Sequence, residues 1–322
     1  MKKNLIYVVL IIFGAIIAYI ILGDIFKNDL NKTSKNPYAF DIKEFVKIDS
    51  SMIKYREVTR IGVKFPEPKA LDYQKGLLGI AYLNHFQVID TMGQEYFNKT
   101  INGPITCISF APDGKIFLGC KNHIEQYDIN GNLLEKWDEL DSSSYITSIA
   151  FKDNAVFVAD AGGPMVYRYN YQGEILNSFD GTGRVESDYG FIVPSPYFDV
   201  EVDPDNQLWI ANTGLQHIEN YTDEGTLRGY WGEPSFTLKG FTGCCNPAQF
   251  AILSNGSFVT CEKGLVRIKV YLPSGEVESV VASSKDFDAD SKPADLAVDE
   301  DDKIYVLDIS RKMIRKFERK DS

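Results

Sequence analysis

The 322-residue sequence has few of the residues and motifs that usually carry chemistry: it has three histidines, no CxxC pair, no HExxH motif and no serine elbow. These gaps remove the sequence signatures of zinc-thiolate sites, zinc proteases and serine hydrolases. Positive charge is also scarce, because 34 Lys and Arg stand against 45 Asp and Glu, giving a formal net charge of -11. Nucleic-acid binding needs a surplus of basic residues to neutralise phosphates. We therefore expect no nucleic-acid partner.

One long hydrophobic run is present, at residues 5–22, preceded by Lys2 and Lys3. A run of about 18 apolar residues can cross a hydrocarbon core, and the lysines favour a cytoplasmic N-terminus. We predict a cytoplasmic N-terminus at 1–4, a transmembrane signal anchor at 5–22, a polar linker at 23–50 and a folded domain at 51–322. The chain would then be a single-pass membrane protein with its domain in the periplasm or on the exterior. A cleavable signal peptide is the alternative.

One sequence pattern recurs six times between residues 69 and 320. Each copy contains a short apolar strand, an acidic or Gly-containing turn, a second strand, a polar loop, a third strand, a turn with Gly and a fourth strand. Repeats of roughly 40 to 50 residues with four strands are typical of propeller blades, which pack against one another in a ring. The second strands are expected to end at Tyr82, Cys120, Asp160, Asn212, Cys261 and Asp308.

The sixth copy stops after its third strand, at Lys320. The stretch 53–65, IKYREVTRIGVKF, lies ahead of the first copy and is free to supply the missing strand. Closing the ring in this way removes open sheet edges. The sequence therefore predicts an all-β, six-bladed β-propeller of four-stranded blades, closed by an N-terminal strand and preceded by one transmembrane helix.

Within these repeats, Asn84-His85-Phe86 and Asn122-His123-Ile124 resemble the name-giving tripeptide of the NHL-repeat family, and VADAGG and IANTGLQHI resemble its strand-loop-strand core. The resemblance covers residues 69–320. The segment GFTGCCNPAQFAILSNGSFVTCEKGLVRIKVY is also similar to a subgroup of uncharacterised bacterial NHL-repeat proteins with a Gly-Cys-Cys-Asn-Pro loop. For that subgroup the resemblance implies no activity, although related propellers include lactonases and lyases with a metal at the channel mouth.

In such a ring, loops that follow second strands and loops that precede first strands share one face. The two longest connections, 181–196 and 233–246, reach this face, and insertions there are often binding surfaces. A loop that merely tolerates extra length is the alternative. The predicted ligand-binding rim consists of polar and cysteine side chains that lie on this face of the ring: Cys244, Cys245, Asn246, Asp160, Asn212, Glu262 and Asp308.

The adjacent cysteines Cys244 and Cys245 are the most distinctive feature of the rim. A disulfide between neighbours is strained, because their Cα atoms lie about 3.8 Å apart and the usual disulfide range begins at about 4.4 Å. We consider three interpretations: a vicinal disulfide that stiffens the loop or contacts a ligand, a disulfide from either cysteine to Cys261, and thiolates that bind metal or carry redox chemistry. Five cysteines in an exported protein leave at least one unpaired.

The channel offers a second candidate site. The first strands place Asp199, Gln249 and Asp295 at one channel-side position, and Asp72 and Glu201 follow two residues after that position. Converging oxygen ligands can hold a divalent metal such as Ca²⁺, so Asp199 and Asp295 are candidate metal ligands. Solvated channel residues are the alternative, and no other cofactor is expected.

The three histidines, His85, His123 and His217, occupy the same place in their repeats, which favours a packing role over catalysis. No catalytic residue is assigned. The leading hypothesis is a binding or scaffold module for a protein, peptide or glycan, rather than an enzyme. The alternatives are a metal-dependent hydrolase or lyase with its site at the channel mouth, and a redox or copper-handling module that uses Cys244 and Cys245.

Overall fold

The computed structural model describes residues 12–19, 47–183, 189–288, 291–293 and 295–320. Residues 12–19, inside the predicted anchor, are helical. The rest of that anchor, and the linker up to residue 46, lie outside the described residues. Within the described part of the chain, no helix is both long enough and apolar enough to span a membrane. The transmembrane anchor therefore stays a prediction.

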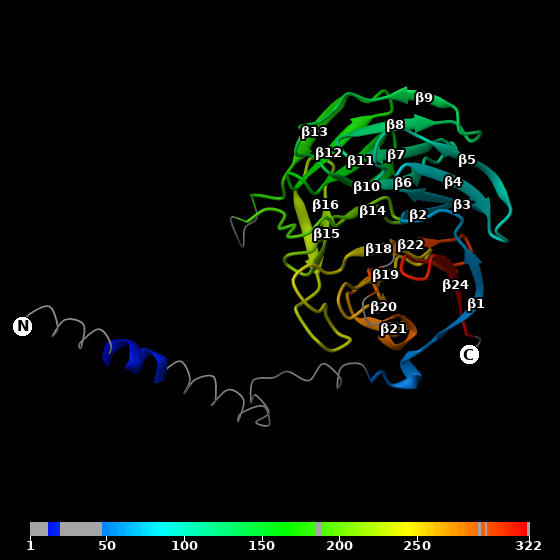
Figure 1. The fold of residues 1–322 in the computed structure, drawn as a ribbon. Helices are drawn as coiled ribbons and strands as arrows, with labels where there is room; N and C mark the ends of the chain where they lie inside the picture. Colours follow the sequence, from blue (N-terminus) through cyan, green and yellow to red (C-terminus); the bar gives the residue numbers. More distant parts are fainter. Residues whose placement is uncertain (1–11, 20–46, 184–188, 289–290, 294, 321–322) are drawn as a thin grey trace, which may run out of the picture. The chain divides into compact units, whose positions relative to one another are not determined.

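Residues from 55 onward form six antiparallel four-stranded sheets arranged as the blades of a propeller (Figure 1). Each of the first five blades takes its four strands consecutively from the chain. Blade 1 contains β2 (Pro68–Gln74), β3 (Leu77–Tyr82), β4 (His85–Asp90) and β5 (Glu95–Thr100). Blade 2 contains β6 (Cys107–Phe110), β7 (Ile116–Cys120), β8 (His123–Tyr127) and β9 (Leu133–Lys136). Blade 3 contains β10 (Ile146–Lys152), β11 (Ala155–Asp160), β12 (Met165–Asn170) and β13 (Ile175–Phe179).

The remaining blades follow the same plan. Blade 4 contains β14 (Val200–Val202), β15 (Leu208–Asn212), β16 (His217–Tyr221) and β17 (Leu227–Trp231). Blade 5 contains β18 (Gln249–Ile252), β19 (Phe258–Cys261), β20 (Ile268–Tyr271) and β21 (Val277–Ala282). Blade 6 contains β22 (Asp295–Val298), β23 (Ile304–Asp308), β24 (Met313–Arg319) and β1 (Tyr55–Gly62). The two short 3₁₀ helices are η2 (Ser50–Met52) and η3 (Ser284–Asp286).

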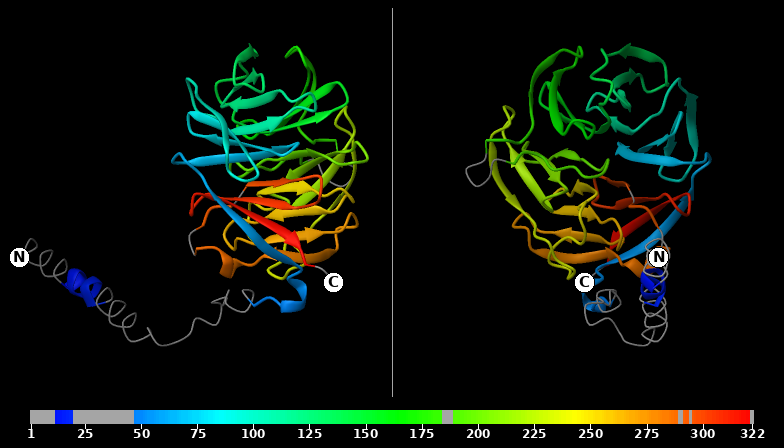
Figure 2. Two further views of the ribbon diagram at one scale, coloured as in Figure 1. Left: turned by 90° about the vertical axis from the view of Figure 1, so that its right-hand side faces the viewer. Right: turned by 60° about the vertical axis from the view of Figure 1, so that its left-hand side comes forward.

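Ring closure joins distant parts of the sequence in blade 6. Strand β1 runs antiparallel to β24, and the pairing extends from Tyr55 opposite Arg319 to Gly62 opposite Met313. Figure 2 shows this blue strand lying beside the red C-terminal strand. Tyr55 and Ile61 are buried, so β1 contributes to the core as well as to the sheet. The prediction that 53–65 supplies the closing strand is confirmed.

The predicted blade register is confirmed as well, because all six second strands end at the residues expected from the repeat. Neighbouring blades are packed through large aromatic side chains that need a glycine opposite them. A Cβ on Gly173 would lie 2.6 Å from the Trp137 ring, and one on Gly275 would lie 2.7 Å from Trp231. Both glycines also have positive φ, which other residues rarely adopt. The glycine turns between third and fourth strands are therefore part of the contact between blades.

The connections after second strands and before first strands bond to one another, as in Ile146 N to Lys121 O at 2.6 Å and Ala161 N to Tyr145 O at 2.9 Å. We call the side of the ring that carries them the loop face. It consists of the described residues of these connections, namely 63–67, 83–84, 101–106, 121–122, 137–145, 161–164, 180–183, 189–199, 213–216, 232–248, 262–267, 283–288, 291–293 and 309–312.

Candidate functional site

Two of the predicted rim residues are buried anchors of the loop face. The carboxylate of Asp160 accepts hydrogen bonds from Tyr145 N at 2.7 Å and Gly162 N at 2.8 Å. The side-chain oxygen of Asn212 accepts one from Ile192 N at 3.0 Å. Each side chain thus fixes the loop that precedes a first strand to the end of a second strand. Their hydrogen-bonding capacity is used inside the fold, as expected for buried polar groups.

Asn246 and Asp308 are anchored in the same manner. Asn246 is 1% exposed, and its amide accepts from Lys263 N at 2.5 Å and donates to Lys263 O at 3.0 Å. Asp308 is 2% exposed, accepts from Arg311 N at 3.1 Å and faces the Arg315 guanidinium at 3.6 Å. Both side chains are therefore buried and hydrogen-bonded within the fold, and their part in a ligand-binding rim stays a prediction.

Glu262 forms a buried ion cluster with two cations. Arg267 lies 2.6 Å from its carboxylate and Lys269 also lies at 2.6 Å, and all three side chains are at most 1% exposed. The cations also donate to the backbone of the long connection, from Arg267 to Phe236 O at 3.2 Å and from Lys269 to Gly240 O at 2.7 Å. Burial lowers the pKa of Lys269 to about 8. Separating one partner from such a cluster would leave an uncompensated buried charge, so the two cations stay in place. Because they also bond to the loop carbonyls, they hold the long connection firmly.

Cys244 is the predicted rim residue that remains exposed, whereas Cys245 is buried at 3%. Their sulfurs lie 3.3 Å apart. The neighbouring Cys245 thiol raises the pKa of Cys244. A disulfide needs a sulfur separation of about 2.0 Å, and Cys261 is buried with its thiol near the Glu262 carbonyl at 3.8 Å. The vicinal disulfide and the bond to Cys261 both stay predictions.

Aromatic side chains accompany the cysteine loop on this face. The Lys263 ammonium lies 5.5 Å from the centre of the Tyr197 ring. Burial raises the pKa of Tyr197, and the nearby Cys261 and Cys245 thiols add to the shift. Phe236, in the long connection, is 43% exposed.

These aromatic residues are not among the site residues predicted from the sequence. Tyr145 stands immediately before β10, which begins at Ile146, whereas Tyr197 stands three residues before β14, which begins at Val200. Tyr145 is 38% exposed. The two rings do not share one offset from their strands, so the repeat pattern does not single them out.

The channel contains a small polar cavity of about 40 Å³, enough for one or a few water molecules or an ion. The predicted channel residues Asp199, Gln249 and Asp295 all line it, together with Asp72 and Glu201. Neither lysine nor arginine is among the residues that line this cavity. The structure therefore brings four carboxyl groups together, while the role of Asp199 and Asp295 as metal ligands stays a prediction.

Three of these carboxylates hold neighbouring blades together. Asp72 and Asp295 lie in first strands and Asp199 immediately precedes one, and each accepts a hydrogen bond from a backbone N–H in the first strand of the next blade. The pairs are Asp295 with Leu71 N at 2.7 Å, Asp72 with Phe110 N at 2.6 Å, and Asp199 with Phe250 N at 2.8 Å. The channel acids therefore have a structural function that sequence inspection did not show.

Burial also favours the protonated form of every channel acid. It raises the pKa of Asp72 and of Asp199 to about 6, and that of Asp295 to about 8. The pKa of Glu201 is raised well above its usual value by burial and by repulsion from Asp199. The cavity thus retains protons at neutral pH that the same residues would lose in water.

The three histidines begin the third strands β4, β8 and β16, and none of them lines the channel cavity. His85 stacks on Phe65 with ring centres 4.9 Å apart, and His217 stacks on Tyr230 at 4.3 Å. These contacts agree with the packing role expected from their repeated position.

The sequence matches no protein-family model and no curated protein. Solved structures match it over most of its length. A streptogramin B lyase shares 12% identity over 84% of this chain and 100% of its own, with a TM-score of 0.59. A catalytically inactive histidine-to-alanine variant of virginiamycin B lyase from Staphylococcus aureus, solved with quinupristin, shares 14% identity over 82% and 99%, with a TM-score of 0.58. A protein of unknown function from Bacteroides thetaiotaomicron shares 14% over 79% and 70%, with a TM-score of 0.59.

At these identities the likeness shows the six-bladed β-propeller fold alone. Membership of the NHL-repeat family stays a prediction.

Proposed function

We propose that this chain is a binding or scaffold propeller, anchored in the membrane through residues 5–22 and exposed to the periplasm or exterior. It engages a protein, peptide or glycan through the loop face around Cys244 and Cys245. One observation carries this proposal: the polar rim residues are buried and used as loop anchors, whereas Cys244 and the Tyr145 and Phe236 rings of the same face stay exposed. The surface offered to a partner is thus a firmly held loop with few ionisable groups.

The buried ion cluster supports a binding role for the long connection 233–246. Its backbone carbonyls are held by Arg267 and Lys269, and its end is held by Asn246. Gln216, from the preceding blade, donates to Gly243 O beside the two cysteines. A loop that is ordered before binding loses less conformational entropy when a partner arrives.

The channel gives less support to catalysis. Three of its four acids are hydrogen-bonded to backbone N–H groups, and no histidine lines the cavity. The virginiamycin B lyase similar to this chain is described as inactive when one histidine becomes alanine. In this chain the histidines pack in blades 1, 2 and 4 instead.

A metal-dependent hydrolase or lyase is the second candidate, favoured by one observation. Glu201 projects into a cavity that already holds Asp72, Asp199 and Asp295, and a divalent cation would offset this concentration of acids. Elemental analysis of the purified chain tests the idea. A stoichiometric divalent metal that is lost in Asp199→Asn would favour the enzyme.

The binding proposal is tested with immobilised glycan and peptide libraries as probes. The Cys244→Ala/Cys245→Ala double variant should bind the selected probes at least about tenfold more weakly, a loss expected for central contact residues. Lys75→Ala, in an exposed turn away from the loop face, is the matched control and should bind as the parent does. A double variant that keeps both its melting temperature and its full set of probes would refute the site.

A further inference from the structure

The hairpin between β7 and β8 carries an unassigned set of metal-binding side chains in blade 2. Cys120 ends β7 and His123 begins β8, and the two residues are directly paired in the sheet. Paired residues point to the same face, and Glu125, two residues further along β8, shares that face. The spacing Cys-x-x-His-x-Glu around a tight turn thus places a thiol, an imidazole and a carboxylate together.

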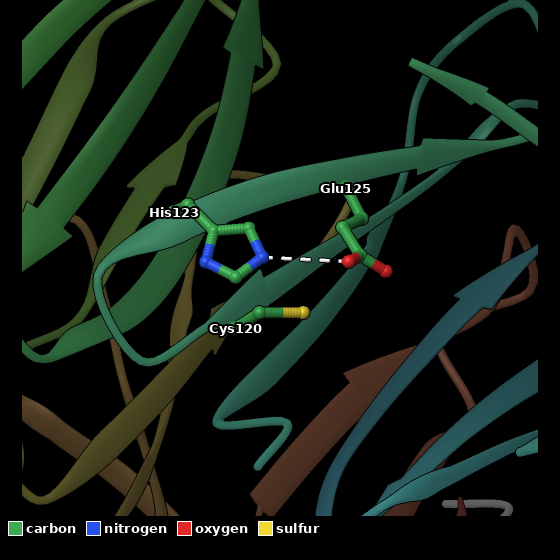
Figure 3. A group of neighbouring side chains, drawn as sticks. All are labelled: Cys120, His123 and Glu125. Carbon is green, nitrogen blue, oxygen red and sulfur yellow. Dashed lines mark hydrogen bonds and ion pairs between the residues drawn. The ribbon is translucent and has the colours of Figure 1, made fainter. Parts of the chain in front are cut away.

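The three potential ligand atoms converge. One atom from each side chain lies within 4.8 Å of the other two. His123 Nε2 and Glu125 Oε1 are 3.4 Å apart, which is long for a hydrogen bond. The distance between these two atoms matches the separation of about 3.4 Å between nitrogen and oxygen ligands on a tetrahedral Zn²⁺. Figure 3 shows the Cys120 sulfur directed toward the gap between the imidazole and the carboxylate.

The surroundings are suited to holding an ion. Cys120 is 2% exposed, Glu125 8% and His123 9%. The second oxygen of Glu125 accepts a hydrogen bond from the Tyr127 hydroxyl at 2.5 Å, which orients the carboxylate. His123 Nδ1 is buried and has no hydrogen-bond partner among the described residues. Only Nε2 of this imidazole therefore has a partner within the described fold, the Glu125 carboxylate.

Blade 4 offers an internal comparison. Its third strand repeats the pattern as His217-Ile-Glu219-Asn-Tyr221, against His123-Ile-Glu125-Gln-Tyr127 in blade 2. The position of Cys120 is taken there by Asn212, whose amide donates to the Glu219 carboxylate at 3.2 Å. An amide thus satisfies that carboxylate in blade 4, whereas blade 2 has a soft sulfur ligand in its place. Packing alone explains the shared His-Ile-Glu-x-Tyr pattern, but it does not explain the thiol.

We propose that Cys120, His123 and Glu125 bind a divalent transition metal of the Zn²⁺ class. A thiolate and a carboxylate together neutralise the charge of the ion, and this mixture of soft and hard ligands favours Zn²⁺ over Ca²⁺ or Cu⁺. The thiol proton is released to solvent as the metal binds. Three protein ligands leave a fourth position for water or an external ligand.

Co²⁺ tests the site in the full chain, since its complexes with thiolates absorb in the near ultraviolet. The experiment uses a Cys244→Ser/Cys245→Ser background, because the neighbouring thiols on the loop face would also bind soft metals. The chelator-treated protein should take up one equivalent of Co²⁺, develop the thiolate absorption and lose it when Zn²⁺ is added. Cys120→Ser should weaken binding by at least about tenfold and abolish the absorption. His217→Gln, the matched control in blade 4, should leave the affinity for Co²⁺ and the thiolate absorption unchanged.

Glu125→Gln is the second variant, because it keeps the shape of the side chain and an acceptor for Tyr127. It should weaken binding by about tenfold or more while retaining the thiolate absorption and the melting temperature of the background protein. The proposal is overturned if the background protein binds no stoichiometric Co²⁺. It is equally overturned if Cys120→Ser and Glu125→Gln both bind as tightly as the background. Either result leaves the proposed function of the loop face untouched, because the site lies in another blade.

Discussion

Replacing Glu201 with glutamine should weaken the dependence of stability on pH near neutrality. Glu201 shares the channel cavity with Asp72, Asp199 and Asp295, and burial raises the pKa of all four groups. A raised pKa means that the folded chain still holds a proton after the unfolded chain has released it. The stabilisation is therefore complete below the unfolded pKa, about 4, and is lost as the pH rises through the folded value.

The magnitude follows from the number of extra protons. Near pH 7, Asp295, with a pKa of about 8, retains its proton, whereas Asp72 and Asp199, with pKa values of about 6, have largely released theirs. Glu201, whose pKa is raised well above its usual value, contributes up to one further proton. Between one and two extra protons in the folded state reduce the free energy of unfolding by about 1.4 to 2.7 kcal/mol per pH unit. Glu201→Gln removes the Glu201 contribution, which leaves about 1.4 kcal/mol per pH unit.

Urea unfolding between pH ~6.5 and ~7.5, after treatment with a chelator, measures this slope. Glu224→Gln, which removes a carboxyl group that is exposed, is the matched control and should keep the parental slope. An unchanged slope in Glu201→Gln would show that Glu201 is ionised in the folded protein. A parent whose stability rises with pH across this interval would refute the account of the whole cluster.

Three further perturbations test other parts of the structure. Ile61→Ala, in the buried face of the closing strand, should lower the free energy of unfolding by about 2–5 kcal/mol. Val58→Ala, at an exposed position of the same strand, should change it by less than about 0.5 kcal/mol. Equal effects of the two substitutions in urea unfolding would contradict the closure of the ring by β1. Glu262→Gln should lower the free energy of unfolding by about 3–5 kcal/mol, because two buried cations lose their counter-charge. Hydrogen exchange of the backbone amides in 233–241 should also accelerate. Unchanged exchange would mean that Lys269 and Arg267 do not hold that loop. In reduced native protein, iodoacetamide should modify Cys244 well ahead of the four buried cysteines. Peptide mass spectrometry measures the alkylation rate of each cysteine, and equal rates would contradict the described burial.

Omitting the reductant from the alkylation experiment tests the predicted vicinal disulfide. If Cys244 and Cys245 become reactive only after reduction, they form a disulfide, and the redox or copper-handling alternative loses its free thiols. If Cys244 reacts directly, the disulfide prediction is wrong. Peptide mass spectrometry distinguishes these outcomes from a bond to Cys261, because the linked peptides differ.

Much of the architecture was predictable because it depends on local spacing. The alternation within strands, the glycine turns and the ends of the second strands repeat along the chain, so they locate each blade without knowledge of its neighbours. The sixth repeat was predicted to take its fourth strand from the stretch around Tyr55, and β1 occupies that place. The repeated position of His85, His123 and His217 likewise predicted that all three would begin third strands.

The sequence by itself determined the number of blades, their register and the gathering of the cysteine loop and the channel acids near particular strands. Only the tertiary structure decided which of these side chains are available to a ligand. Asp160 and Asn212 are buried because loops from other parts of the chain bond to them, and Asp199 is held by Phe250 N, which lies in the next blade. The free energy of a polar side chain depends on the partners that surround it in space. Those partners lie 15, 20 and 51 residues away along the chain, and a repeat pattern does not specify them.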